Sequence, residues 1–279
     1  MAGLNVNRTD LLWTLGKYLP RRGADAFAKL AAPIASLLRM SAVDAWATSV
    51  ARATGSLPTR GMRRRLIEHW VRNNLWSLSL ERWSDAEIHR VALIADEHVE
   101  RLRSSLAGPG LVLALPHMGS WDFAGTWCAR IGIPVVSVAE RLPDGMYERF
   151  HAAREGMGMS IFPVDQPRLL PALADEVRAG KMVCLLADRD LSSHGMKVPW
   201  PDSTEMISVP PGPALLARRT GADLRVATTH FAGGRLGMTV SPPITGDTPD
   251  TLMRGVVAHF AEGVRRHPES WLMLREAFV

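Results

Sequence analysis

One histidine and one aspartate offer the most direct chemistry in this sequence. His117 and Asp122 lie five positions apart, in the segment PHMGSWD. The apolar run at 111–115 is typical of a strand, and Ser120 is a favourable helix N-cap, so the pair spans a strand, a turn and a helix start. A carboxylate that accepts from one imidazole nitrogen fixes the tautomer and leaves the other nitrogen as a base. We therefore predict that Asp122 orients His117 as a general base, although such a pair also arises by chance.

Short apolar runs alternate with helical segments from residue 110 onward. The expected strands are 111–115, 135–139, 182–187, 224–229 and 236–240. The expected helices are 122–131, 147–156, 169–179, 213–220 and 251–266. This alternation predicts an α/β fold with a mostly parallel central sheet flanked by helices.

The preceding part of the chain has helical periodicity throughout. Apolar stripes recur at Leu11, Leu12, Leu15, Tyr18 and Leu19, then at Phe27, Leu30, Ala31, Ile34, Leu37 and Leu38. The segment SDAE at 84–87 is a capping box that predicts one more helix through about Arg103. We expect an N-terminal helical region, 1–104, packed on an α/β core, 105–279, as one integrated domain.

Composition narrows the class of protein. The chain has 279 residues, 47% of them hydrophobic, and a net charge of +5. This is a globular composition, and the basic balance suits a nucleic acid, an anionic membrane or a phosphorylated substrate. No nucleic-acid motif accompanies the charge, so we expect no nucleic-acid partner. Cys128 and Cys184 lack metal-ligand spacing, which predicts reduced core thiols and neither a metal nor a redox cofactor.

Membrane contact is expected at a surface only. Charged residues interrupt the N-terminal apolar runs, so the sequence predicts neither a secretory signal nor a spanning helix, which needs about 20 mostly apolar residues. Amphipathic helices with basic polar faces adsorb to anionic leaflets. Trp13, Lys17, Arg21 and Arg22 fit this pattern, as does the basic face at 63–72. The alternative is that these helices pack on the sheet, and we favour it for the interior ones.

Five ordered segments carry a family resemblance. LALPHMGSWDFAG resembles the first motif of glycerolipid-type acyltransferases, a His followed by four residues and an Asp. More closely, the run from 105 to 279 resembles the bacterial family of lipid A late acyltransferases and actinobacterial phosphatidylinositol mannoside acyltransferases. The other matching segments are VVSVAERLPDGMYERFHAAREGMGM, LLADRDLSSHGMKVPW, VPPGPALLARRTGA and HPESWLMLREAF. The Asp-Arg-Asp block and the His-Pro-Glu-Ser-Trp ending look more like the mannoside branch.

The resemblance implies roles for three residues around the base. His117 would take the proton from an acceptor hydroxyl that attacks an acyl thioester, and Asp122 would stabilise the imidazolium. Glu140 follows the next strand, and the family suggests a carboxylate near the catalytic His. A surface ion pair between Glu140 and Arg141 is the alternative.

It also implies substrate contacts further along the chain. Asp188, Arg189 and Asp190 end a strand and would bind acceptor hydroxyls or phosphate, with Arg189 as the anion clamp. A structural ion-pair cluster is the competing interpretation.

Two more charged residues are weaker candidates for substrate binding, and three aromatic residues are candidates for the wall of an acyl groove. Arg154 precedes Glu155, and such a pair is commonly a solvated helix face. Glu205 would line the site, although the segment around it is longer than the family spacing. An acyl chain needs an apolar groove, for which Trp121, Phe123 and Trp127 are candidates, but aromatic stripes more often form core.

The sequence thus predicts a peripheral membrane O-acyltransferase on the cytoplasmic leaflet, with acyl-CoA as co-substrate. The expected acceptor is a membrane glycolipid, most specifically a mannose of phosphatidylinositol mannoside. Lipid A or a lysophospholipid is the alternative acceptor. A non-catalytic membrane-bound lipid-binding protein is the alternative of another class. A serine hydrolase is disfavoured because the sequence has no G-x-S-x-G elbow.

Overall fold

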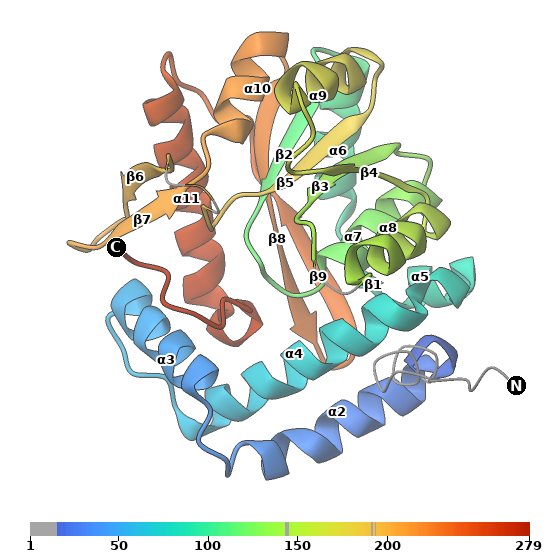
Figure 1. Ribbon diagram of the computed structural model, residues 1–279, viewed down its shortest axis with the longest axis vertical. Coiled ribbons are helices and arrows are strands. Elements are labelled where there is room, and N and C mark those ends of the chain that lie inside the picture. The colour runs from blue at the N-terminus through green and yellow to red at the C-terminus, as the bar shows by residue number, and fades with distance from the viewer. Residues whose placement is uncertain (1–15, 143–144, 191, 193) are drawn as a thin grey trace, which may run out of the picture.

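The computed structural model describes residues 16–142, 145–190, 192 and 194–279. In this part of the chain a seven-stranded sheet runs in the order β1-β9-β8-β2-β5-β3-β4, and β6 and β7 form a separate hairpin (Figure 1). The strands are β1 (Ala92–Leu93), β2 (Leu111–Leu115), β3 (Val135–Ala139), β4 (Met159–Pro163), β5 (Met182–Leu186), β6 (Met196–Pro199), β7 (Met206–Val209), β8 (Asp223–Ala232) and β9 (Arg235–Val240). The α-helices are α2 (Arg21–Ala35), α3 (Ser41–Thr54), α4 (Arg60–Ser79), α5 (Asp85–Val91), α6 (Asp96–Ala107), α7 (Trp121–Arg130), α8 (Met146–Gly156), α9 (Leu169–Arg178), α10 (Gly212–Thr220) and α11 (Pro249–Arg266).

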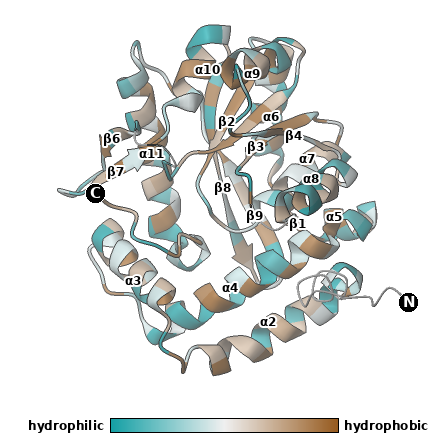
Figure 2. Cartoon of the chain, in the orientation of Figure 1, coloured by the Kyte–Doolittle hydropathy of each residue, from teal (hydrophilic) through white to brown (hydrophobic). Residues whose placement is uncertain are grey.

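The sheet is parallel except where β9 pairs antiparallel with β8. Every residue of β2 is buried, because β2 lies in the middle of the sheet and helices cover both faces. Hydrophobic residues accordingly concentrate along the central strands (Figure 2). The predicted α/β class and all five predicted strands are confirmed.

Two hydrophobic clusters divide the core between the faces of the sheet. One face, with Leu113 and Cys184, packs with α7 and with Trp76 of α4. The other face, with Val112 and Val183, packs with α9, α10 and α11. Residues from before and after position 104 enter both clusters, so the N-terminal helices bury their apolar sides against the sheet region.

Local predictions were wrong at two places. The helix expected from the capping box through Arg103 is broken, because α5 ends at Val91 and the next two residues pair with β9 as β1. The capping box itself is present at Ser84. Strand β4 and the β6–β7 hairpin were not anticipated, because their short runs are interrupted by serine, lysine or proline.

Helix α2 packs along α4 (Figure 1), and its two sides differ sharply in burial. Ala24, Ala28 and Ala32 are fully buried. The large apolar residues of the predicted stripe point to solvent: Phe27, Leu30, Ile34, Leu37 and Leu38. The small residues allow close helix packing, so the large ones are left on the outer side.

Much of the predicted basic surface is engaged in ion pairs. Lys17 pairs with Glu81, and Arg21 pairs with Asp25. On α4, Arg72 is only 2% exposed and pairs with Asp25. This residue therefore belongs to the packed interior rather than to a membrane-binding surface. Leu11, Leu12, Trp13 and Leu15 lie outside the described residues. Within the described ranges, no helix combines the length and the apolarity needed to cross a membrane.

Candidate active site

His117 lies in the loop that joins β2 to α7, and that loop is fastened on two sides. The carbonyl of His117 accepts from the Leu272 backbone N–H at 2.7 Å. The next carbonyl, of Met118, accepts from Thr229 Oγ1 at 2.6 Å. Gly119 has φ +55°, and a Cβ there would lie 2.8 Å from the Thr229 backbone, so only glycine allows this approach. The loop therefore holds His117 in a defined position.

A buried carboxylate from the neighbouring strand orients the His117 ring. Asp188, two residues beyond β5, places Oδ1 2.5 Å from His117 Nδ1. Its Oδ2 accepts from the His117 backbone N–H and from Trp271 Nε1, both at 2.9 Å. Burial by itself raises the pKa of Asp188, but the adjacent His117 and these hydrogen bonds lower it overall. An ionised Asp188 assigns the proton to Nδ1 and leaves His117 Nε2 free to accept a proton.

The prediction that Asp122 contacts His117 is wrong. Asp122 is buried in the first turn of α7, where it accepts from Ser77 Oγ at 2.8 Å and from Arg154 Nε at 2.8 Å. The helix start directs this carboxylate toward α4 and α8. The carboxyl ends of β2 and β5 lie side by side, which brings Asp188 to His117 instead.

Arg154 is likewise not a solvated partner of Glu155. Its guanidinium joins α8 to the start of α7 through Asp122, and its side chain is mostly buried. Glu155 instead lies near His151, at 3.4 Å. Asp122, Ser77 and Arg154 thus form a polar link between three helices, and Asp122 and Arg154 also line the cavity described below.

Glu140 and Arg189 face each other at the carboxyl edge of the sheet. Arg189 Nη2 donates to Glu140 Oε2 at 2.9 Å, and both side chains line the cavity described below. The alternative pair with Arg141 is wrong, because Arg141 Nε donates to Asp165 at 2.8 Å. Among the described residues, the buried Arg189 Nε has no hydrogen-bond partner, so this group retains capacity to bind an acceptor oxygen.

The remaining charged candidates divide between the cavity and the outside. Asp190 also lines the cavity, where its carboxylate accepts from the backbone N–H groups of Ser192 and Gly195 and shapes that turn. Glu205 pairs with Arg52 of α3 and is not among the lining residues. The prediction that Glu205 lines the site is therefore wrong: the β6–β7 hairpin carries it toward α3.

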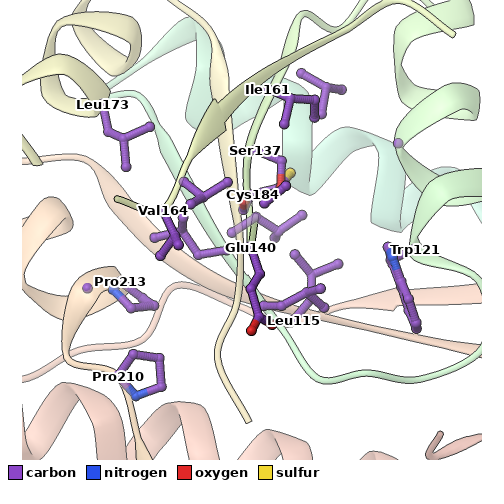
Figure 3. A pocket seen from close by; sticks show the side chains of 18 of the residues that line it. Leu115, Trp121, Ser137, Glu140, Ile161, Val164, Leu173, Cys184, Pro210 and Pro213 are labelled. Atoms are coloured by element: carbon purple, nitrogen blue, oxygen red, sulfur yellow. Dashed lines mark hydrogen bonds between the residues drawn. The ribbon is translucent and has the colours of Figure 1, made fainter. Parts of the chain in front are cut away.

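A cavity of about 690 Å³ opens beside His117. Its walls are mostly apolar (Figure 3). Trp121 lines it as predicted, with its ring 5.3 Å from that of His117 and nearly perpendicular to it. Phe123 and Trp127 do not line it, because both are buried in the core around Trp76. Strand residues that periodicity alone does not mark as functional supply much of the wall: Leu113, Leu115, Ser137, Ile161 and Leu186.

The two cysteines also line this cavity, and both are free thiols. Burial raises the pKa of Cys128 to about 12, and burial likewise raises the pKa of Cys184. A thiol that stays protonated is a weak nucleophile. Both residues therefore act as small apolar wall groups.

Comparison with known proteins identifies the family of this chain. Residues 65–279 match the family described as bacterial lipid A biosynthesis acyltransferase, and this chain belongs to that family. It is 36% identical over 187 residues to the phosphatidylinositol mannoside acyltransferase of Mycolicibacterium smegmatis, covering 65% of this chain and 61% of that protein. It is 37% identical over 178 residues to the protein of the same name from Mycobacterium tuberculosis, covering 62% and 56%. The matched stretch thus spans about three fifths of each relative.

Proposed function

We propose that this chain is an O-acyltransferase that moves a fatty acyl group from acyl-CoA to a mannose hydroxyl of a phosphatidylinositol mannoside. The observation that carries the proposal is the hydrogen-bonded His117–Asp188 pair beside a deep apolar cavity. Family membership supports acyl transfer, and the names of the two mycobacterial relatives support the acceptor.

The His117 ring performs the proton transfers of this reaction. His117 Nε2 takes the proton of the acceptor hydroxyl while the oxygen forms a bond to the thioester carbonyl carbon. Asp188 stabilises the resulting imidazolium through Nδ1–H. The tetrahedral intermediate then collapses, the C–S bond breaks, and the thiolate of coenzyme A takes the proton from Nε2. The products are the ester and a free thiol, and His117 returns to its starting state.

The charged residues at the cavity edge bind the acceptor. Arg189, whose Nε has no partner within the described part of the chain, donates to sugar or phosphate oxygens of the acceptor. Glu140 holds Arg189 through one Nη and keeps acceptor capacity for hydroxyls, since its side chain is half exposed. Asp188 is fully engaged with His117 and Trp271, so it orients the base rather than the acceptor.

Helix α2 brings the enzyme to its lipid substrates. Its exposed apolar residues are flanked by the exposed cations Arg22, Lys29 and Arg39. This combination favours adsorption to an anionic leaflet, with the apolar side chains entering the boundary between headgroups and acyl chains. The protein acts at the cytoplasmic face of the membrane as a peripheral enzyme.

The direct test is His117→Ala, assayed with palmitoyl-CoA and purified phosphatidylinositol mannoside. Loss of a general base lowers kcat by about 10²- to 10⁴-fold. Retained turnover in a variant of unchanged Tm would eliminate His117 as the base. A wild-type protein that binds anionic vesicles but transfers no acyl group, to this acceptor, lipid A or a lysophospholipid, would instead be a lipid-binding protein. Acyl carrier protein as donor is the matched comparison for acyl-CoA.

A further inference from the structure

The cavity extends along both faces of the sheet. Leu113, Ser137 and Cys184 are register partners across β2, β5 and β3, so their side chains point to the same face. Val138 and Leu185 are the next residues on their strands and point to the opposite face. All five line one continuous cavity. The cavity therefore wraps around the carboxyl edge of β3 and β5.

Two lobes meet at this edge, where Glu140 and Arg189 face each other. Glu140 lies between the Ser137 and Ile161 side of the cavity and the Pro210 and Pro213 side (Figure 3). We name them by the helices that cover them. The α7 lobe is lined by Leu113, Gly125, Cys128, Ser137, Met159, Ile161 and Cys184. The α9–α10 lobe is lined by Val138, Leu169, Leu170, Leu173, Leu185, Pro213 and Leu215.

The α7 lobe is next to the reactive group. Trp121 is the first residue of α7, and His117 lies in the loop just before it. Both line the cavity on this side. Among the described residues, two polar side chains in its wall are already paired: the Ser137 hydroxyl donates to the Cys184 carbonyl at 2.9 Å, and Arg154 Nε donates to Asp122 at 2.8 Å. This lobe suits the acyl chain of the donor, whose carbonyl must lie close to His117.

The α9–α10 lobe is also built for hydrocarbon. Its walls carry no polar side chain among the described residues; the polar lining groups belong to the edge of the cavity or the α7 side. Pro210, Pro211 and Pro213 line its α10 end and remove three backbone N–H donors there. Val164 and Leu215 extend the apolar surface to solvent, at 43% and 38% exposure. Amide groups, such as those of a pantetheine arm, would lose their hydrogen bonds to water in this lobe.

We propose that the α9–α10 lobe binds a fatty chain of the acceptor lipid while the α7 lobe holds the donor acyl chain. This inference rests on the proposed function, because it takes the acceptor to be a phosphatidyl lipid with fatty chains of its own. The acceptor headgroup then crosses the Glu140–Arg189 edge to reach His117. The enzyme selects acceptors by their lipid part as well as by their sugar.

Lobe-filling substitutions test this assignment. Leu170→Trp and Leu215→Trp add bulk to the α9–α10 lobe at partly exposed positions, and Arg219→Trp, one turn further along α10 and exposed, is the matched control. Two acceptors are compared: the intact mannoside lipid and its deacylated, water-soluble headgroup. We expect KM for the intact lipid to rise about tenfold. This is the loss expected if the added indole keeps about two methylene groups of the fatty chain out of the lobe. KM for the headgroup and for palmitoyl-CoA should stay unchanged, as should every constant of Arg219→Trp.

Other outcomes would overturn the assignment. A raised KM for palmitoyl-CoA would mean that the lobe holds the donor. An equal rise for both acceptors, or no change, would mean that it does not bind the acceptor chain.

A labelling experiment separates this inference from the proposed function, because it needs no turnover. A mannoside lipid with a diazirine in its fatty chain should label the peptide of α9, and a diazirine palmitoyl-CoA should label α7. Wild-type protein without transferase activity but with this labelling would reject the proposed function and keep the two-lobe assignment. Labelling of α7 by both probes would reject the assignment itself.

Discussion

Asp188 holds both the imidazole ring and the backbone N–H of His117, through its two separate carboxylate oxygens. One buried side chain thus sets the tautomer of His117, the proposed base, and helps to fix the position of the loop that carries it. Trp271 from the C-terminal segment completes the arrangement by donating to the same carboxylate.

Asp188→Asn separates the charge of this carboxylate from its shape. An amide of the same size lacks the charge that stabilises the imidazolium and can present its NH2 to Nδ1, which favours the wrong tautomer. We expect kcat to fall at least about 10²-fold, with little change in KM for palmitoyl-CoA. Steady-state kinetics and circular dichroism check this. A variant that folds normally and keeps more than half of wild-type kcat would contradict the role.

Asp122 and Arg154 are coupled in stability. Asp122→Ala leaves the mostly buried Arg154 guanidinium without its partner, which we expect to cost about 3 kcal/mol of unfolding free energy. Adding Arg154→Met should recover part of that loss, because no unpaired charge then remains. Urea unfolding of the single and double variants measures the coupling. Strictly additive losses would show that the pair does not act as a unit.

The stacked histidines predict an acid-sensitive core. The rings of His230 and His267 lie 3.7 Å apart and parallel, and burial, followed by the charge of His267, lowers the pKa of His230 to about 4. Between pH 6.5 and about 4, His230 is protonated more in the unfolded chain than in the folded chain. The free energy of unfolding therefore decreases as the pH falls through this window. In His230→Phe the decline in unfolding free energy over this window should be shallower. An unchanged slope in urea titrations would contradict it.

The outer side of α2 should control membrane affinity. Leu30→Glu and Ile34→Glu place a charge where apolar side chains are 73% and 70% exposed. We expect partitioning to anionic vesicles to fall about tenfold or more for each. Leu57→Glu, at a residue 83% exposed beyond α3, is the control and should bind like wild type. Equal loss in all three variants would point to charge alone rather than to the α2 surface. Acyl transfer from palmitoyl-CoA to the mannoside lipid in detergent should be unaffected.

The local structure around His117 is readable from the sequence because each signal involves neighbouring residues. The apolar run of β2 and the Ser120 cap of α7, whose Oγ accepts from the Phe123 N–H, require only short-range periodicity and turn chemistry. The five ordered segments likewise predicted the family, since motif order is a property of the linear chain.

Tertiary structure decided which carboxylate serves His117. Asp122 is five residues away and Asp188 is 71 residues away, yet the strand order places β5 beside β2, so the distant residue makes the contact. Periodicity marks which residues are apolar but not which side of a helix meets a partner, so the stripe of α2 was expected while its exposure was not. The same holds for the cavity: its walls come from strands and helices whose apolar pattern is that of any core. The way in which α7, α9 and α10 pack on the sheet leaves the space that becomes the cavity.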